Sequence, residues 1–165
     1  MKWDVEFAAT HDASFGWALR CCGYDRAEAD EVLQTAYLKI LDGRARFDGR
    51  SQPRTFLFGV IRHTASERRR RERVRWLAPK RPTLPEPPLA PDETIGRSQE
   101  TDTLLRAMAR LGRRQQEVLH LVFYGDMTIE NAAGVMGIGV GTARTHYTRG
   151  KQRLRKFLEE RDDTE

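Results

Sequence analysis

A proline-rich stretch near the middle of the chain limits the folds that the rest of the sequence can form. Residues 79–91, PKRPTLPEPPLAP, contain six of the seven prolines of the chain. Proline lacks a backbone N–H and fixes φ, so this stretch is incompatible with a helix or a central strand. It predicts a semi-extended linker, residues 79–100, between two small domains, residues 1–78 and 101–165.

Apolar residues recur at helical spacing on both sides of this linker. In the first domain we expect helices over residues 3–22 and 28–41, a polar loop over residues 42–53, and a third helix from Arg54 into a run of arginines. The second domain contains two helical stretches, which end at Gly112 and Gly125. The predicted fold is therefore all-α. The three apolar stripes of the first domain are Phe7, Phe15, Ala18, Leu19 and Cys22; Val32, Leu33, Ala36, Tyr37, Ile40 and Leu41; and Phe56, Leu57, Val60, Ile61, Thr64 and Ala65.

The stretch from Thr128 to Leu158 has the pattern of a helix-turn-helix. Thr128 is a suitable N-cap for a short helix through Met136, and the glycines of residues 137–139 permit a turn into a second helix from Val140. One side of that second helix is apolar, with Val140, Ala143, Tyr147, Leu154 and Leu158, and the other side is polar and basic, with Thr142, Thr145, Arg149, Gln152, Arg153 and Lys156. Short hydroxyls can reach base edges while cations neutralise phosphates, so the pattern indicates a recognition helix. A helical hairpin with a solvated basic face is the alternative.

The charge of the chain agrees with a polyanionic partner. Lys and Arg number 29 against 24 Asp and Glu, which gives a net charge of +5. Seven arginines and two glutamates lie between Arg62 and Arg75, where they continue an amphipathic helix. Such a run is either a solvated face or a surface that follows a phosphate backbone. Its outer side contains Arg62, His63, Ser66, Arg69, Arg70 and Arg73.

Several other classes of protein fit the sequence poorly. No apolar run reaches membrane-spanning length, and the first ten residues have no signal or transit pattern, so we expect a cytoplasmic protein without membrane insertion. The two cysteines, Cys21 and Cys22, are adjacent and suit neither a disulfide framework nor a zinc site. There is no glycine-rich phosphate loop, and the histidines lack ligand spacing, so we expect no enzyme activity, cofactor or metal. The histidines are His11, His63, His120 and His146.

The order of these features resembles the extracytoplasmic-function (ECF) sigma factors, the smallest class of the sigma-70 family of bacterial RNA polymerase subunits. Residues 137–145, GIGVGTART, are similar to the family's G-I-S-V-G-T-V-K-S, and residues 111–121 to its L-P-x-x-x-R-x-V-L-x-L helix. Residues 28–34, EADEVLQ, are similar to its D-A-E-D-L-V-Q, and Phe56-Leu57 with Val60-Ile61 stand at its W-L and I-A. The chain departs from the pattern at Phe56 for tryptophan, His63 for asparagine, Asn131-Ala132 for acid-isoleucine, Gly139 for serine and Thr35 for an acid.

The resemblance implies a division of labour between the two domains. The first would bind the β′ clamp of core RNA polymerase through Glu28, Asp30, Glu31 and Gln34. It would read and open the downstream (−10) promoter element with Phe47, Asp48, Arg62, His63, Ser66, Arg69 and Arg70. The second would bind the polymerase β flap and the upstream (−35) element, the latter through Thr142, Arg144, Thr145, His146, Arg149 and Arg153. A helix-turn-helix regulator acting without polymerase is the alternative, but it leaves the first domain without a role.

Regulation is the least constrained part of the interpretation. An anti-sigma factor is one candidate partner. A Ser/Thr kinase is another, because phosphorylation of Thr35 would restore negative charge where the family has an acid, adding about −1.5 to −2 charges at neutral pH. The alternative is that Thr35 is a neutral surface residue and that Glu28, Asp30 and Glu31 supply enough charge.

Overall fold

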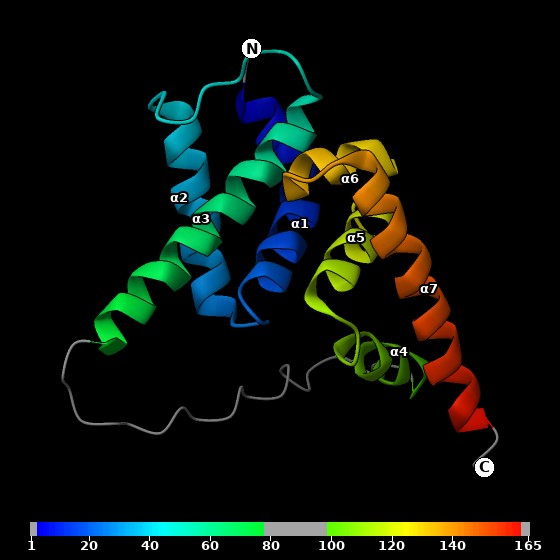
Figure 1. Ribbon diagram of the computed structural model, residues 1–165. Helices are drawn as coiled ribbons and strands as arrows, with labels where there is room; N and C mark the ends of the chain where they lie inside the picture. The colour runs from blue at the N-terminus through cyan, green and yellow to red at the C-terminus, as the bar shows by residue number, and fades with distance from the viewer. Residues whose placement is uncertain (1–2, 78–98, 163–165) are drawn as a thin grey trace. The chain divides into compact units, whose positions relative to one another are not determined.

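A computed structural model describes residues 3–77 and 99–162, and these residues form seven helices and no strand (Figure 1). The chain divides into two compact units, Met1–Pro91 and Asp92–Glu165, which we call the first and second units. The all-α fold predicted from the sequence is therefore confirmed. Most of the predicted linker lies outside the described residues, and its last two positions belong to the first helix of the second unit.

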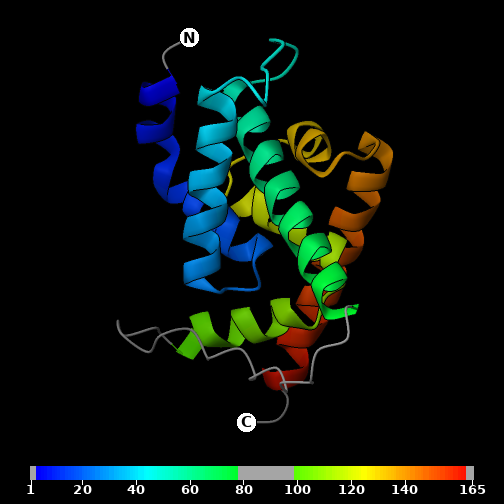
Figure 2. The same cartoon turned by 90° about the vertical axis from the view of Figure 1, so that its left-hand side faces the viewer.

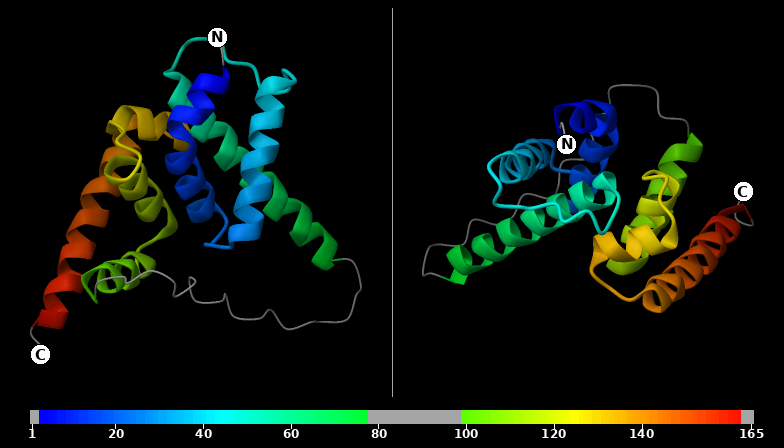
Figure 3. Two further views of the ribbon diagram at one scale, coloured as in Figure 1. Left: turned by 180° about the vertical axis from the view of Figure 1, so that it is seen from behind. Right: turned by 90° about the horizontal axis from the view of Figure 1, so that it is seen from above.

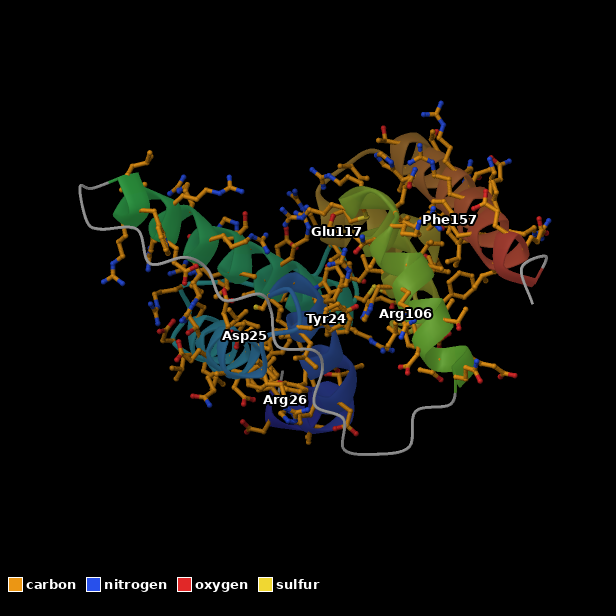
Figure 4. All side chains as sticks on the ribbon, turned by 90° about the horizontal axis from the view of Figure 1, so that it is seen from below. Tyr24, Asp25, Arg26, Arg106, Glu117 and Phe157 are labelled. Carbon is orange, nitrogen blue, oxygen red and sulfur yellow. The ribbon has the colours of Figure 1, made fainter. Side chains whose placement is uncertain are left out.

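The first unit is a bundle of three helices, α1 (Trp3–Cys21), α2 (Arg26–Leu41) and α3 (Pro53–Leu77), each packed against the other two (Figure 2). Helix α2 begins after a turn that contains Tyr24 and Asp25 (Figure 4). The Asp25 carboxylate caps α2 by accepting a hydrogen bond from the backbone N–H of Glu28 at 2.9 Å. Helix α3 begins at Pro53, whose fixed φ and missing N–H suit the first turn of a helix.

The core of the first unit is organised around Trp17 and Phe58, both fully buried. Their rings are stacked with centroids 6.2 Å apart, and the Trp17 indole N–H donates a hydrogen bond to the Phe58 carbonyl at 3.0 Å. Neither residue is in the apolar stripes expected from the sequence. The buried residues of α1 are Ser14, Trp17, Ala18 and Cys21. Of the expected stripe, Ala18 and Cys22 are buried and the other three residues are half-buried, so the expectation was right only in part. The large indole ring takes the central position, and Leu41, expected in the core from α2, is 56% exposed.

A cluster of aromatic rings holds the loop between α2 and α3. Phe47, in the middle of this loop, lies with its ring centroid 5.6 Å from that of Trp3 on α1 and 5.3 Å from that of Phe56 on α3. Phe7 extends the cluster by stacking on Tyr37 of α2 at 4.1 Å. The loop is thus fixed at Phe47 by one residue of α1 and one residue of α3.

The second unit contains α4 (Gln99–Ala109), α5 (Arg113–Phe123), α6 (Ile129–Met136) and α7 (Val140–Asp162) (Figure 3). Helices α5, α6 and α7 pack against one another, and α4 packs against α7. Helices α5 and α7 approach closely at Gly150 of α7. A Cβ atom there would lie 3.1 Å from Leu119 Cδ1 and 3.2 Å from Gln115 Cβ, so a larger residue would push α7 away from α5.

Helices α6 and α7 form the helix-turn-helix predicted from the sequence. The Thr128 hydroxyl accepts a hydrogen bond from the Asn131 N–H at 3.1 Å and caps α6. Gly137 ends α6 with a left-handed φ of 64°, a conformation that glycine adopts without cost. The Ile138 N–H then donates to the Ala133 carbonyl at 3.1 Å, which closes the turn before α7.

Helix α5 supports this turn through polar groups. Glu117 on α5 (Figure 4) has a side chain only 3% exposed and lies 3.5 Å from Arg113 Nε and 3.7 Å from Arg114 Nη1. Arg114 also donates to the Met136 carbonyl at 3.3 Å, at the C-terminal end of α6. The buried carboxylate is thereby neutralised, and one carbonyl at the end of α6 is satisfied.

We expect Trp17→Phe to destabilise the first unit. The change keeps an aromatic ring but removes the hydrogen bond to Phe58 and leaves a gap, which should lower the free energy of unfolding by about 1–3 kcal/mol. Urea unfolding followed by the fluorescence of the remaining tryptophans measures this unit, because all three tryptophans of the chain lie in it. Trp76→Phe, at a residue 62% exposed, is the control and should leave the midpoint unchanged. Equal midpoints for the two variants would contradict a central role for Trp17.

Candidate nucleic-acid interface

Helix α7 has one buried side and one exposed side, as the sequence predicted. Ala143 is fully buried, and Gly150 is buried against α5. Tyr147 and Leu154 are half-buried on the same side, and Val140 is 38% exposed. The exposed residues include Thr142, Arg144, Thr145, Arg149 and Arg153, five of the six predicted to contact the upstream element. The sixth, His146, is half-buried beside Tyr147.

Two of the exposed residues near the start of α7 already have partners within the chain. The Thr145 hydroxyl donates to the Gly141 carbonyl at 3.0 Å, so its lone pairs and its methyl group are what it offers to a base. Arg144 Nη2 lies 3.4 Å from Glu130 Oε1 of α6, with both side chains about 60% exposed. Such an exposed ion pair is weak, so Arg144 can exchange Glu130 for a phosphate at little cost.

Helix α3 presents a second exposed basic surface. His63, Ser66 and Arg70 follow one another at helical spacing and are all exposed. Beyond them the helix continues away from its neighbours (Figures 1 and 3), and residues 71–77 are exposed without exception. This end contains Arg71, Arg73 and Arg75, so the cationic surface includes Arg71 and Arg75 in addition to Arg73, which the sequence had already placed on the outer side.

The other two arginines predicted on this surface are half-buried. Arg69 Nη1 donates a hydrogen bond to the Cys21 carbonyl, at the last residue of α1. A cation at a helix C-terminus is favourable because it meets unpaired carbonyls and the negative end of the helix dipole. Arg69 therefore contributes to the packing of α1 on α3. Arg62 is also half-buried.

The acidic residues of α2 are bound by an arginine that sequence reasoning did not single out. Arg68 of α3 donates to Glu31 and lies 3.7 Å from Glu28, and its Nε is 3.6 Å from Glu72 on its own helix. Burial, followed by repulsion from Glu72, raises the pKa of Glu28, and Arg68 opposes that shift. Among the residues predicted to bind polymerase, Asp30 and Gln34 are exposed. Thr35, the predicted phosphorylation site, is half-buried.

The loop predicted to contact the downstream element has an anchored centre and an exposed end. Phe47 is half-buried in the aromatic cluster described above, whereas Asp48 is exposed. Asp48 accepts a hydrogen bond from the Arg50 N–H at 3.0 Å and forms an ion pair with the Arg50 guanidinium at 3.4 Å. The segment from Asp48 to Ser51 is thus exposed, as are residues 42–44, 46 and 52 of the same loop.

A polar cluster links α2 to the exposed side of α3. Lys39 Nζ of α2 lies 2.5 Å from Glu67 Oε2 and 3.2 Å from Thr64 Oγ1. The other oxygen of Glu67 lies 3.2 Å from His63 Nε2. The hydrogen bond from Lys39 is the main cause that lowers the pKa of Glu67. The spacing of four between His63 and Glu67 was visible in the sequence, but the contribution of Lys39 depends on how α2 packs against α3.

The described residues contain no group of three or more metal-ligating side chains, and none of their helices is long and apolar enough to cross a membrane. Both cysteines are free and buried. Burial, the largest cause, raises the pKa of the Cys22 thiol to about 12, which makes it a poor nucleophile.

Two small helical units with exposed basic helices, one of them in a helix-turn-helix, define a nucleic-acid-binding protein. Comparison with known families gives a match in each unit. Residues 7–75 match sigma-70 region 2, and residues 101–154 match sigma-70 region 4. The chain therefore contains both regions in their sequence order, which a helix-turn-helix regulator with only the second unit would not.

Proteins known as RNA polymerase sigma factors are similar to this chain over most of their length. The chain is 30% identical to the RNA polymerase sigma-E factor of Streptomyces antibioticus over 145 residues, covering 84% of this chain and 74% of the relative. It is 29% identical to the ECF sigma factor SigC of Mycobacterium tuberculosis, covering 79% and 70%. It is 26% identical to the ECF sigma factor SigX of Bacillus subtilis, covering 82% and 73%.

Solved structures share the fold. The sigma factor RpoE of Bartonella quintana, solved with the anti-sigma factor NepR, matches with a TM-score of 0.71 and 21% identity, covering 95% of this chain and 96% of that one. CnrH, solved with the cytosolic domain of CnrY, matches with a TM-score of 0.62 and 19% identity, covering 94% and 86%.

The chain belongs to the ECF class of the sigma-70 family. It is a bacterial RNA polymerase sigma factor, which binds core polymerase and directs promoter recognition and transcription initiation. Sigma factors are transcription initiation factors and not enzymes. The absence of enzyme activity in this chain stays a prediction.

We expect Glu67 to stabilise the first unit in a pH-dependent way. Because Lys39 lowers the pKa of Glu67 in the folded protein, the ionised carboxylate stabilises the fold above its ordinary pKa of 4.5, and this stabilisation is lost as the pH falls through the lowered value. The difference in urea midpoint between wild type and Glu67→Gln should therefore be largest at neutral pH and shrink below that ordinary value. Asp30→Asn, at an exposed acid of α2, is the control. A difference that stayed constant with pH would contradict the interaction.

Proposed function

We propose that the two exposed helices divide promoter binding between them. Helix α7 binds the upstream element in the major groove, and α3 with the end of its preceding loop reads and opens the downstream element. The domains that do this are residues 1–78 and 101–165, with residues 79–100 between them. The observation that supports the proposal is the same in both helices: one stripe is buried, and the opposite stripe, which contains the cations, is exposed.

Helix α7 can supply both affinity and sequence preference. Arg149 and Arg153 are exposed on the outer side of the helix, where a cation neutralises a phosphate whatever the base sequence. Thr142 and Thr145 are exposed nearer its N-terminal end, which is the part of a recognition helix that reaches base edges. Arg144 and His146 are the two residues next to Thr145, and His146 is half-buried.

Helix α3 has what is needed to hold an opened promoter. Separating two strands without fuel requires cations for the displaced phosphates and surfaces for the unpaired bases. Arg70, Arg71, Arg73 and Arg75 provide exposed cations along the last turns of α3. The loop from Asp48 to Ser51 lies beside the start of this helix and provides polar groups, while Phe47 holds the loop in place.

The acidic side of α2 is the proposed contact with the β′ clamp of polymerase. Asp30 and Gln34 are exposed and offer the most accessible groups. Glu28 and Glu31 are held by Arg68, which fixes their side chains and partly neutralises them. A basic clamp surface would therefore meet one free acid and two acids that it shares with Arg68. The second unit would complete the contact at the β flap.

An anti-sigma factor is the proposed regulator. The sigma factor RpoE, which shares this fold, was solved in complex with the anti-sigma factor NepR. Phosphorylation of Thr35 by a kinase stays a prediction, and the residue is half-buried. A cytoplasmic location follows from the proposed work on polymerase and promoter.

Reconstitution tests the proposal as a whole. The full chain, mixed with core RNA polymerase, should start transcription from genomic fragments that it does not bind tightly alone. Substitutions on α2 should reduce core binding, whereas substitutions on α3 or α7 should leave core binding intact and reduce promoter use. Tight binding of the chain alone to an operator, with no effect on core polymerase, would contradict it.

Arg149→Ala should weaken holoenzyme binding to all promoters and reduce its salt dependence, because one phosphate contact is lost. Thr145→Ala should instead change the preference among bases at one position of the upstream element. Filter binding of holoenzyme at several salt concentrations, on a set of single-base promoter variants, separates the two effects. Arg106→Ala, at an exposed arginine of α4, is the control. Wild-type binding by Arg149→Ala would show that the outer side of α7 does not face DNA.

Joint replacement of Arg70 and Arg73 by alanine should spare core binding but reduce open-complex formation, because both exposed arginines lie on the proposed strand-holding surface. Arg69 is left intact because its hydrogen bond to Cys21 serves the fold. Permanganate footprinting detects unpaired thymines directly. Normal melting by the double variant would remove this surface from the mechanism.

A further inference from the structure

Three side chains connect the interior of the first unit to its proposed DNA-facing surface. Lys39, Glu67 and His63 follow one another at 2.5 Å and 3.2 Å, and their side chains become progressively more exposed, at 18%, 32% and 72%. His63 shares its exposed stripe with Ser66 and Arg70. The chain of contacts therefore ends at the surface proposed to read the downstream element.

The first contact determines what Glu67 can do. A lysine ammonium has three hydrogen-bond donors and no acceptor, so Glu67 Oε2 accepts from Lys39. This bond also favours the ionised form of Glu67, whose two oxygens can then only accept. The oxygen that faces His63 is consequently an acceptor.

The second contact determines where His63 keeps its proton. Nε2 of His63 lies 3.2 Å from Glu67 Oε1, and an acceptor at that distance favours N–H at Nε2. A neutral imidazole has a single ring N–H, so Nδ1 is left with a lone pair. His63 thus offers a hydrogen-bond acceptor to whatever lies against this side of α3.

We propose that Lys39 and Glu67 are positioning residues that make His63 a hydrogen-bond acceptor toward the promoter, so that His63 selects a base with an amino group on its major-groove edge. The inference rests on the proposed contact between α3 and the downstream element. Cytosine presents only its N4 amino donor in the major groove, whereas guanine presents only the acceptors O6 and N7. Cytosine is therefore favoured over guanine at the position that His63 reads.

One substitution should reverse this preference. In Glu67→Gln the lysine can pair only with the amide oxygen, because the ammonium has no acceptor for the amide N–H₂ group. The amide N–H₂ group then faces His63 and donates to Nε2. The imidazole proton moves to Nδ1, and His63 becomes a donor that favours guanine over cytosine.

The tautomer can be measured without DNA. Long-range ¹H–¹⁵N correlation spectra of the full chain, recorded at a pH of about 8.5 where an ordinary imidazole is neutral, distinguish the two ring nitrogens. The signals of His63 are those missing in His63→Asn. We expect the proton on Nε2 in wild type and on Nδ1 in Glu67→Gln. A wild-type proton on Nδ1 would overturn the inference even if the variant failed to fold.

Promoter selection supplies the second readout. Holoenzyme transcription is compared on templates with a C·G or a G·C pair at each position of the downstream element. At the position read by His63, wild type should prefer cytosine by about two- to tenfold, the worth of one hydrogen bond, and Glu67→Gln should prefer guanine. Glu72→Gln removes the same charge from the same helix, and it should behave like wild type.

The two readouts separate this inference from the function on which it rests. If His63→Ala changes the preference at no position, the proposed contact of α3 with the downstream element fails. If His63→Ala abolishes a preference that Glu67→Gln leaves unchanged, the contact stands and the positioning role of Glu67 is overturned. Reversal of both the tautomer and the base preference supports the inference.

Discussion

The first unit depends on the contact between Trp17 and Phe58. An indole that is fully buried must find an acceptor for its N–H, and here that acceptor is the Phe58 carbonyl, which fixes the position of the indole along α3. The stacked rings and the hydrogen bond to a backbone carbonyl together fix how far α3 is shifted along α1 and how it is rotated about its own axis. All side chains of α3 turn together when the helix rotates about its axis. The same contact therefore decides which arginines face solvent and which, like Arg69, face the C-terminal end of α1.

In the second unit the orientation of α7 is fixed by small residues instead of large ones. Ala143 and Gly150, buried and seven residues apart, let α7 lie close to its neighbours, and their spacing places them on one side of the helix. The residues between them on the outer side are left exposed. Both units thus use a rigid internal contact to orient a long helix, and the orientation of the helix turns an ordinary series of arginines into a directed surface.

Local signals in the sequence were enough to predict the helix-turn-helix but insufficient to predict the contacts between helices. The helix-turn-helix was predictable because Thr128 and Gly137 act within their own turns, so no distant residue is needed to interpret them. The roles of Trp17, Arg68 and Lys39 depend on partners 25 to 41 residues away, on other helices. An arginine in a run of arginines has no local mark that says whether it will face DNA or a carboxylate. The buried face of α1 was predicted only in part for the same reason. Its apolar residues allow two faces, and the packing of Trp17 selects one of them.

The loop between α2 and α3 shows how such a protein could diversify. Phe47 holds the loop by its ring, while the residues that follow, Asp48 to Ser51, are exposed and make hydrogen bonds within the loop. Substitutions at Asp48, Arg50 and Ser51 would change the shape and charge of this segment but remove nothing from the hydrophobic core, whereas Gly49 has a left-handed φ of 75° that a larger residue would strain. The anchor and these three positions are adjacent in the sequence yet under different constraints. If the loop contacts the promoter as proposed, promoter preference can change at these three positions without a matching loss of folding stability.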